Sequence, residues 1–165
     1  MIFLYIAIIS SCLYLLLNFI WHQHRNTIIV RNQVLFYILQ WTWGILANII
    51  GGFTALILSL VYKIKPEKSG FCLCIPLDKN WGLSIGMFIF GAKSVLEHEH
   101  GHSFQNAVYG PFFLFIVALP SVIRFWYREL AYRFGNRAKL PDYDSIWFEG
   151  QATKSGNKFF DKGTA

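Results

Sequence analysis

Long runs of apolar residues dominate the first third of the chain. Residues 2–21 ("IFLYIAIISSCLYLLLNFIW") and residues 33–62 carry no charge, and the short polar stretch "HQHRNTIIVRN" separates them. Because about 20 apolar helical residues cross the ~30 Å hydrocarbon core of a bilayer, each run is long enough to span one. The first run has neither a basic leading segment nor a small-x-small cleavage site, so we interpret it as a retained anchor. The pattern predicts a transmembrane hairpin in residues 1–62, with helices at about 2–21 and 38–62.

The pattern changes in residues 63–92. Residues 63–80 hold two prolines and several charges, which places them outside the hydrocarbon. The stretch "WGLSIGMFIFG" (81–91) alternates loosely between apolar and small residues and is bounded by glycines, which is typical of a strand or of a buried apolar segment. We therefore expect a loop and a short edge strand in residues 63–92.

A third apolar run begins after a cluster of histidines. No charge occurs in residues 103–123, and Pro111 and Pro120 punctuate this stretch. We expect an apolar helix at 111–126 that either spans the membrane or re-enters it, within a helical region covering 93–156, and a flexible tail at 157–165. The predicted fold class is an all-α membrane protein: an N-terminal hairpin, a helical region with a third membrane-embedded or re-entrant helix, and a short strand before that region.

Composition and charge support the membrane interpretation. Hydrophobic residues make up 55% of the chain and charged residues 15%, whereas soluble domains carry roughly a quarter charged residues. The net charge is +6, but the cations gather beside apolar runs, at 63–68 and at 124–139, as headgroup anchors do. No nucleic-acid-binding module accompanies them, so we expect membrane lipid as a partner and no nucleic acid. The three cysteines offer no second pair that would complete a thiolate zinc site.

Residues 98–102 read "HEHGH" and fit the pattern H-E-x-x-H. On a helix, positions i and i+4 share a face, so His98 and His102 can present imidazole nitrogens to one metal ion. Glu99 lies beside the first ligand and can take a proton from water at the metal. His100 lies on another side of the helix, where it fits a supporting or substrate-facing role better than ligation. A histidine patch without chemistry is the alternative.

A catalytic zinc site needs one more protein ligand, because such sites use three ligands and keep one position open. No histidine follows His102, so a downstream ligand must be a carboxylate. The candidates are Glu129, Asp142, Asp144 and Glu149. We favour Glu149, since Ala152 follows it by one helical turn in E-x-x-A and would let its helix pack closely against the motif helix.

The motif H-E-x-x-H followed about fifty residues later by E-x-x-A resembles the glutamate-ligand zinc peptidases, the gluzincins. Within that group it is most similar to integral-membrane peptidases related to prenyl-protein endopeptidases. Five short stretches also resemble small uncharacterised bacterial membrane proteins with a metallopeptidase motif. They are "SIG" (84–86), "L-x-HE-x-GH-x-x-Q" (96–105), "GP-x-x-LF" (110–115), "PS" (120–121) and "W-x-E-x-x-A" (147–152). The resemblance covers about 81–156, and Thr153 stands where the prenyl-protein enzymes have an acidic residue.

The resemblance implies a zinc metallopeptidase of the H-E-x-x-H type in the bacterial inner (cytoplasmic) membrane. His98, His102 and Glu149 would hold Zn²⁺, Glu99 would activate water, and the substrate would be a peptide or protein. The strand before the motif could hold an extended peptide by main-chain hydrogen bonds. Four residues remain open as oxyanion donors or supporting groups: His100, Tyr109, Arg124 and Tyr143.

Two other functions compete with the peptidase. A di-iron membrane oxidase could combine His22 and His24 with the cluster, but such enzymes resemble families with more histidines than the five present here. A non-enzymatic membrane interaction protein with a structural or vestigial metal site also fits, and the short chain leaves little room for a substrate chamber. The small size suggests that the site is completed by a homo-oligomer or by lipid.

Overall fold

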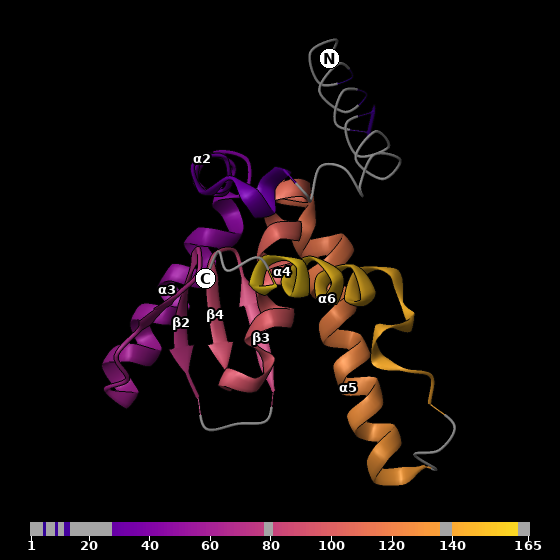
Figure 1. The fold of residues 1–165 in the computed structure, drawn as a ribbon. Coiled ribbons are helices and arrows are strands. Elements are labelled where there is room, and N and C mark those ends of the chain that lie inside the picture. The colour runs from indigo at the N-terminus through magenta and orange to yellow at the C-terminus, as the bar shows by residue number, and fades with distance from the viewer. Residues whose placement is uncertain are drawn as a thin grey trace.

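A computed structural model describes residues 5, 9, 12–13, 28–77, 81–135 and 140–161 of the chain. Its long helices are α2 (Gln33–Trp41), α3 (Ile45–Tyr62), α4 (Leu96–Tyr109), α5 (Leu119–Phe134) and α6 (Trp147–Phe160). Its strands are β1 (Glu67–Ser69), β2 (Cys72–Pro76), β3 (Gly82–Ile85) and β4 (Phe88–Gly91). Short turns of 3₁₀ helix at Lys93–Val95, Gly110–Phe112 and Tyr143–Ser145 and a π-helical turn at Leu114–Ala118 connect them (Figure 1).

The four strands form one mixed sheet in the order β1-β2-β4-β3. Strands β2 and β4 are parallel, and β1 and β3 pair antiparallel with them, so β3 is a free edge. Helix α3 covers one face through a cluster around Ala55, Ile75 and Phe90. Helix α4 covers the other face, where Cys72 and Ile89 belong to the main core. Helix α6 lies across α4 on the side away from the sheet (Figure 1).

The prediction of an all-α membrane protein with an N-terminal hairpin is wrong. A sheet is present, and among the described residues α3 alone is long and apolar enough to cross a membrane by itself. The segments 93–112 and 114–134 pass the same test only as a pair bent by 119°. The predicted helix at 2–21 lies outside the described residues apart from four positions, Tyr5, Ile9, Cys12 and Leu13.

The sequence pattern indicated a strand within 81–91, where β3 and β4 lie, but not β1 and β2, which have only three and five residues. Strand β2 has five residues, "CLCIP", none of them exposed, so it shows no alternation of apolar and polar positions. Gly70 and Gly86 adopt positive φ values of 51° and 66° in the turns between strands, which glycine tolerates without strain. The segment expected as a loop with one strand, 63–92, thus contains all four strands.

The helices also differ in detail from their predicted ranges. The run expected as one helix at 38–62 is divided at residues 42–44, where a side chain on Gly44 would collide with the amide of Asn106. The helix expected at 111–126 has 3₁₀ and π-helical turns in its first part and becomes α5 at Leu119, which continues to Phe134; Pro120 lies in the first turn of α5, where proline is tolerated. The segment 157–160, expected in the flexible tail, is the end of α6, and residues 162–165 lie outside the described chain.

Candidate metal centre

Helices α4 and α6 approach closely enough for their backbones to touch. A Cβ atom on Gly101 of α4 would collide with the carbonyl oxygen of Ala152 in α6. In return, a Cβ atom on Gly156 of α6 would collide with the carbonyl oxygen of Glu97 in α4. The two glycines therefore permit a spacing that no other residue would allow, and this spacing brings the side chain of Glu149 to the motif histidines.

His98, His102 and Glu149 meet at one point. The Oε2 atom of Glu149 lies 3.0 Å from Nε2 of His98 and 3.2 Å from Nε2 of His102. The two Nε2 atoms lie 3.1 Å apart. Tetrahedral ligands about 2.0–2.1 Å from a zinc ion are separated by about 3.3 Å, so the three atoms have nearly the spacing of zinc ligands. This cluster could hold a metal ion.

The orientation of the His102 ring is determined by Gln105. The Nε2 atom of Gln105 donates to the carbonyl oxygen of Phe148 and to Oε1 of Gln151, both at 2.7 Å. Its Oε1 atom therefore faces His102 and accepts from Nδ1–H at 2.7 Å. With Nδ1 protonated, the neutral ring carries a free lone pair on Nε2, which points toward Glu149.

Thr153 has the corresponding role for His98. Its hydroxyl oxygen lies 2.8 Å from Nδ1 of His98 and can accept that proton. The ring then also turns a lone pair on Nε2 toward the carboxylate of Glu149. The residue that departs from the pattern of the prenyl-protein enzymes thus still supports a ligand, as hydrogen-bonding partners of metal-bound histidines do.

Three lone pairs facing one another repel unless a cation lies among them. The Oε1 atom of Glu149 is buried and makes no hydrogen bond within the described part of the chain. Burial would raise the pKa of Glu149, but hydrogen bonds from His102 and His98 outweigh it and hold that pKa well below its usual range. For His102, burial lowers the pKa, but the hydrogen bond and charge of Glu149, the charge of Glu99 and the hydrogen bond with Gln105 together raise it further. The donor set therefore fits a positive charge, either a proton or a metal ion.

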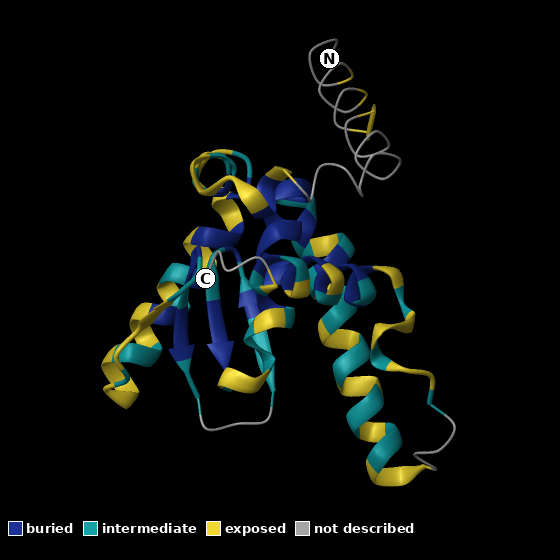
Figure 2. Ribbon diagram, viewed as in Figure 1, coloured by how far each residue is buried: buried dark blue, intermediate teal, exposed yellow. Residues whose placement is uncertain are grey.

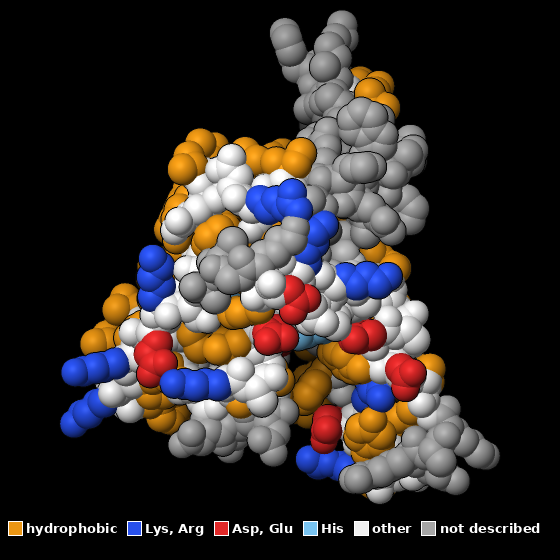
Figure 3. Space-filling view, viewed as in Figure 1, with side chains coloured by type: hydrophobic (Ala, Val, Ile, Leu, Met, Phe, Trp, Pro, Cys, Tyr) orange, Lys and Arg blue, Asp and Glu red, His pale blue; other side chains and the backbone are white. Residues whose placement is uncertain are grey.

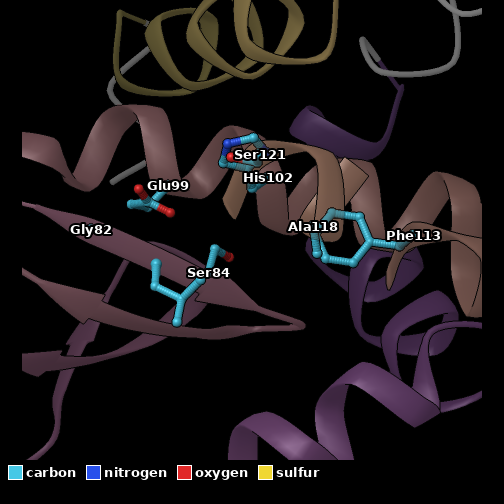
Figure 4. Close-up of a pocket in the computed structure, with 8 residues that line it drawn as sticks. Gly82, Ser84, Glu99, His102, Phe113, Ala118 and Ser121 are labelled. Carbon is cyan, nitrogen blue, oxygen red and sulfur yellow. The ribbon is translucent and has the colours of Figure 1, made fainter. Parts of the chain in front are cut away.

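Glu99 lies in the wall of an open hollow of about 280 Å³ next to the cluster. The hollow lies between the free edge of the sheet and the start of α5 (Figure 4). The residues that line it are Gly82, Leu83, Ser84, Glu99, His102, Phe113, Ala118 and Ser121. The Oε2 atom of Glu99 is buried without a hydrogen-bond partner in the described chain, and burial raises the pKa of this carboxyl group. A Cβ atom on Gly82 would approach Oε1 of Glu99 to 2.5 Å, so glycine leaves room for the carboxylate.

Of the four residues left open as supporting groups, Tyr143 is nearest the cluster. Its ring packs against the His98 ring, with centroids 5.9 Å apart. Burial raises the pKa of Tyr143, with Glu149 contributing, so its hydroxyl stays protonated and can donate. Arg124 does not face the cluster directly: its Nη2 atom donates to the carbonyl oxygens of Asp142 and Tyr143, each at 2.9 Å, and so holds the loop before α6.

The other two candidate supporting residues, His100 and Tyr109, make their contacts away from the cluster. His100 is fully buried, and its ring nitrogens lie 2.7 Å from the carbonyl oxygen of Leu96 and 2.8 Å from that of Ser69. It fastens the turn between β1 and β2 to α4. Tyr109 is buried at the far end of α4, where its ring packs edge-on against Trp147.

The remaining carboxylates proposed as third ligands stay apart from the cluster. Asp142 and Asp144 are exposed in the loop before α6, and Glu129 lies on α5. Sequence reasoning did not single out Gln105 as a supporting residue, although its position three residues after His102 on the same helix was a usable signal. Comparisons with protein-family models, curated proteins and solved structures found no match for this chain. What the site does must therefore follow from its own residues.

Proposed function

We propose that the protein is a zinc-dependent peptidase that hydrolyses a peptide bond in the hollow beside the cluster. The observation that carries the proposal is the convergence of three ligand atoms beside Glu99, a buried carboxylate with an unpartnered oxygen. Two imidazoles and one carboxylate suit zinc, and three protein ligands leave a position open, as catalytic zinc sites require. A purely structural zinc site would use four protein ligands.

The chain's own residues supply the proton transfers. Bound zinc would contribute a Lewis acid that polarises the scissile carbonyl and makes water a stronger acid. Oε2 of Glu99 would take the proton from the attacking water and deliver it to the amide nitrogen as the C–N bond breaks. The raised pKa of Glu99 suits this role, because a general base works best when its pKa lies near the working pH. The Tyr143 hydroxyl is the donor best situated for the developing oxyanion.

The free edge of β3 offers a place for an extended substrate. The carbonyl oxygen of Trp81 accepts from the N–H of Ala92, which follows β4. Because hydrogen bonding alternates along an antiparallel pair, Leu83 also bonds toward β4, while Gly82 and Ser84 turn their N–H and C=O groups to the free edge. Both residues line the hollow. A peptide added there as a further strand would pass beside Glu99 and His102.

The test pairs metal analysis with cleavage of a peptide library read by mass spectrometry. Protein purified in detergent without chelators should hold about one zinc per chain, and the zinc should be lost in His98→Ala and Glu149→Ala. Glu99→Gln should keep the zinc and lose on the order of a hundredfold to ten-thousandfold in cleavage rate. Glu97→Gln, an exposed neighbour on the same helix, is the matched control and should cleave normally.

Two results would contradict the proposal. Absence of zinc from the wild-type protein would show that the cluster does not bind zinc. Equal cleavage rates for wild type and Glu99→Gln would show that Glu99 is not the base. Zinc retained without cleavage of any library member would instead identify a non-enzymatic protein with a structural metal site.

A further inference from the structure

We infer that a lipid bilayer covers the outer faces of α3 and α5. The inference starts from α3, which packs on the sheet through small residues such as Ala47, Gly51 and Ala55. Its opposite side exposes large apolar side chains along its whole length, with Phe53 65% and Leu60 70% exposed. The exposed members of this face are Ile45, Leu46, Ile49, Ile50, Phe53, Leu56, Ile57, Leu60, Val61 and Tyr62. So large an exposed apolar surface indicates a binding surface.

The dimensions and ends of α3 fit a bilayer. Eighteen helical residues extend about 27 Å, close to the thickness of the hydrocarbon core. The mean hydropathy of the helix is 2.0, and 22% of it is buried in the protein. The exposed Trp41 lies before it, and the exposed Lys63 and Lys65 follow it directly. Aromatic and basic residues at the ends of an apolar helix favour the headgroup layer, and anionic lipids attract the lysines.

Helix α5 carries a second apolar face. Leu119, Val122, Ile123, Trp126 and Leu130 recur at helical spacing and are all exposed, and the exposed Phe115 lies in the π-helical turn before α5. On another side of α5, Arg124 and Arg128 donate to carbonyl oxygens of residues 141–143, so these cations do not cover the apolar stripe. In Figure 1, α3 and α5 run toward the same end of the molecule on either side of the sheet. Their basic C-terminal residues, Lys63 and Arg133, therefore lie toward that end.

A buried cluster of amide side chains lies where α2, α3 and α4 meet. The Oε1 atom of Gln40 accepts from Nδ2 of Asn48 at 2.8 Å and from Nδ2 of Asn106 at 2.5 Å, and all three residues are buried. Polar side chains inside and apolar ones outside are the arrangement expected where the surroundings are hydrocarbon. Figure 2 shows exposed residues as yellow bands along α3 and α5, and Figure 3 shows charged side chains over the face that carries α6.

Lipid is a better occupant of these faces than a second protein. A protein interface has a polar rim around its apolar centre, but residues 33–62 contain no charged residue along the whole outer face. The cations stand only at the ends, where headgroups would lie. This inference does not depend on the proposed peptidase activity, and its test does not use activity.

The experiment measures which reagents reach spin labels on the protein in vesicles of equal parts phosphatidylcholine and phosphatidylglycerol. One accessible cysteine at a time replaces Phe53 or Trp126, and Lys154→Cys on α6 is the matched exposed control, all in a Cys12→Ser background that keeps the buried Cys72 and Cys74. Apolar residues 2–21 could attach any variant to vesicles, so attachment alone is not the readout. Label collisions with oxygen, which dissolves in lipid, are compared with collisions with chromium oxalate, which stays in water.

We expect the ratio of oxygen to chromium oxalate collisions at Phe53→Cys and Trp126→Cys to exceed that at Lys154→Cys by about tenfold or more, since oxygen concentrates in hydrocarbon and the chelate is excluded. Equal ratios at all three positions would overturn the inference, because the faces would then lie in water. Protection of Phe53→Cys and Trp126→Cys from both reagents would also overturn it, because protein would then be the occupant.

Discussion

Helix α3 has 18 residues, none of them charged, and it exposes most of its large apolar side chains. Helix α4 has 14 residues with two glutamates and three histidines, and 11 of its 14 residues are buried. Charged and polar side chains usually lie at the surface and large apolar ones inside, so the two helices reverse the usual distribution. Their arrangement shows that the polar residues of α4 are kept inside because they have partners there.

The partners of α4 explain how the burial of so many polar groups is tolerated. An unpaired buried polar group costs roughly 1–3 kcal/mol, more if it is charged. Most polar side chains of α4 are paired, as His102 is with Gln105 and Glu149. Within the described chain, Glu99 and Asn106 of α4 each keep one unpaired buried oxygen, and Glu99 lines the hollow. The following changes test the contrast between the polar interior and the apolar exterior, in order of expected effect.

Removing a ligand should have the largest effect. We expect His102→Ala to weaken zinc binding by more than about a hundredfold, since loss of a ligand should exceed the 10- to 100-fold cost of losing a supporting group. Competition with a zinc chelator measures this affinity. Ile57→Ala on the outer face of α3 should leave it unchanged, and equal losses in both variants would mean that the cluster is not the metal site.

Removing the support of a ligand should cost less. Gln105→Met keeps a similar volume but leaves Nδ1 of His102 without its acceptor. Zinc affinity should fall by roughly 10- to 100-fold. The same chelator competition measures it, with the thermal stability of the metal-free protein as a check on folding. An affinity equal to that of the wild type would show that Gln105 does not orient the ligand.

Glycine substitutions compare how tightly the backbone is packed between α4 and α6 with how tightly it is packed at α3. Gly156→Ala would force its Cβ atom against the carbonyl oxygen of Glu97, and we expect a loss of about 1–3 kcal/mol in the free energy of unfolding. In α3, a Cβ atom on Gly52 meets only the Phe88 ring, at 3.3 Å. Gly52→Ala should therefore change stability by less than about 1 kcal/mol, since better helix propensity offsets the contact. Denaturant titration in detergent compares the two, and equal losses would contradict the close contact of α4 and α6.

Zinc should stabilise the protein more at pH 8 than at pH 6. The pKa of His102 is raised in the folded metal-free protein, so protonated His102 stabilises the fold. This contribution is fully present below the unfolded pKa of about 6.5 and is lost as the pH rises through the folded pKa. The lowered pKa of Glu149 has the opposite pH dependence: the stability that its carboxylate contributes to the fold is present above about pH 4.5 and is lost in acid. Zinc must displace the proton that His102 carries at low pH, and this cost falls as the pH rises. Thermal unfolding with and without zinc measures the difference, and a larger zinc effect at pH 6 would contradict this linkage.

The smallest effect is expected on the exterior. Ile57→Ala removes an exposed side chain of α3 and should change the free energy of unfolding in detergent by about 0.5 kcal/mol or less. Ile75→Ala removes a fully buried one between α3 and the sheet and should cost about 2–5 kcal/mol. Similar losses would show that the outer face of α3 packs against protein.

The site was more predictable from sequence than the fold. The i, i+4 spacing of His98 and His102 is a property of a single helix, so it could be read locally. Glu149 could be selected because Ala152 marks a helix able to pack closely. The sheet depends on contacts between segments, and strands of three to five residues carry too few positions for a period to emerge. Tyr143 reaches His98 only through the loop that Arg124 holds, which no local pattern encodes.

The reciprocal contacts of Gly101 and Gly156 have a consequence for reading other chains. A chain that kept the two histidines and the glutamate but carried a larger residue at either glycine would hold its two helices farther apart. Its sequence would still contain the motif, but the two histidine nitrogens and the glutamate oxygen would no longer lie together. The glycine pair is therefore a further requirement, beside the two histidines and the glutamate, for the three atoms to meet, and it can be checked in any sequence without a structure.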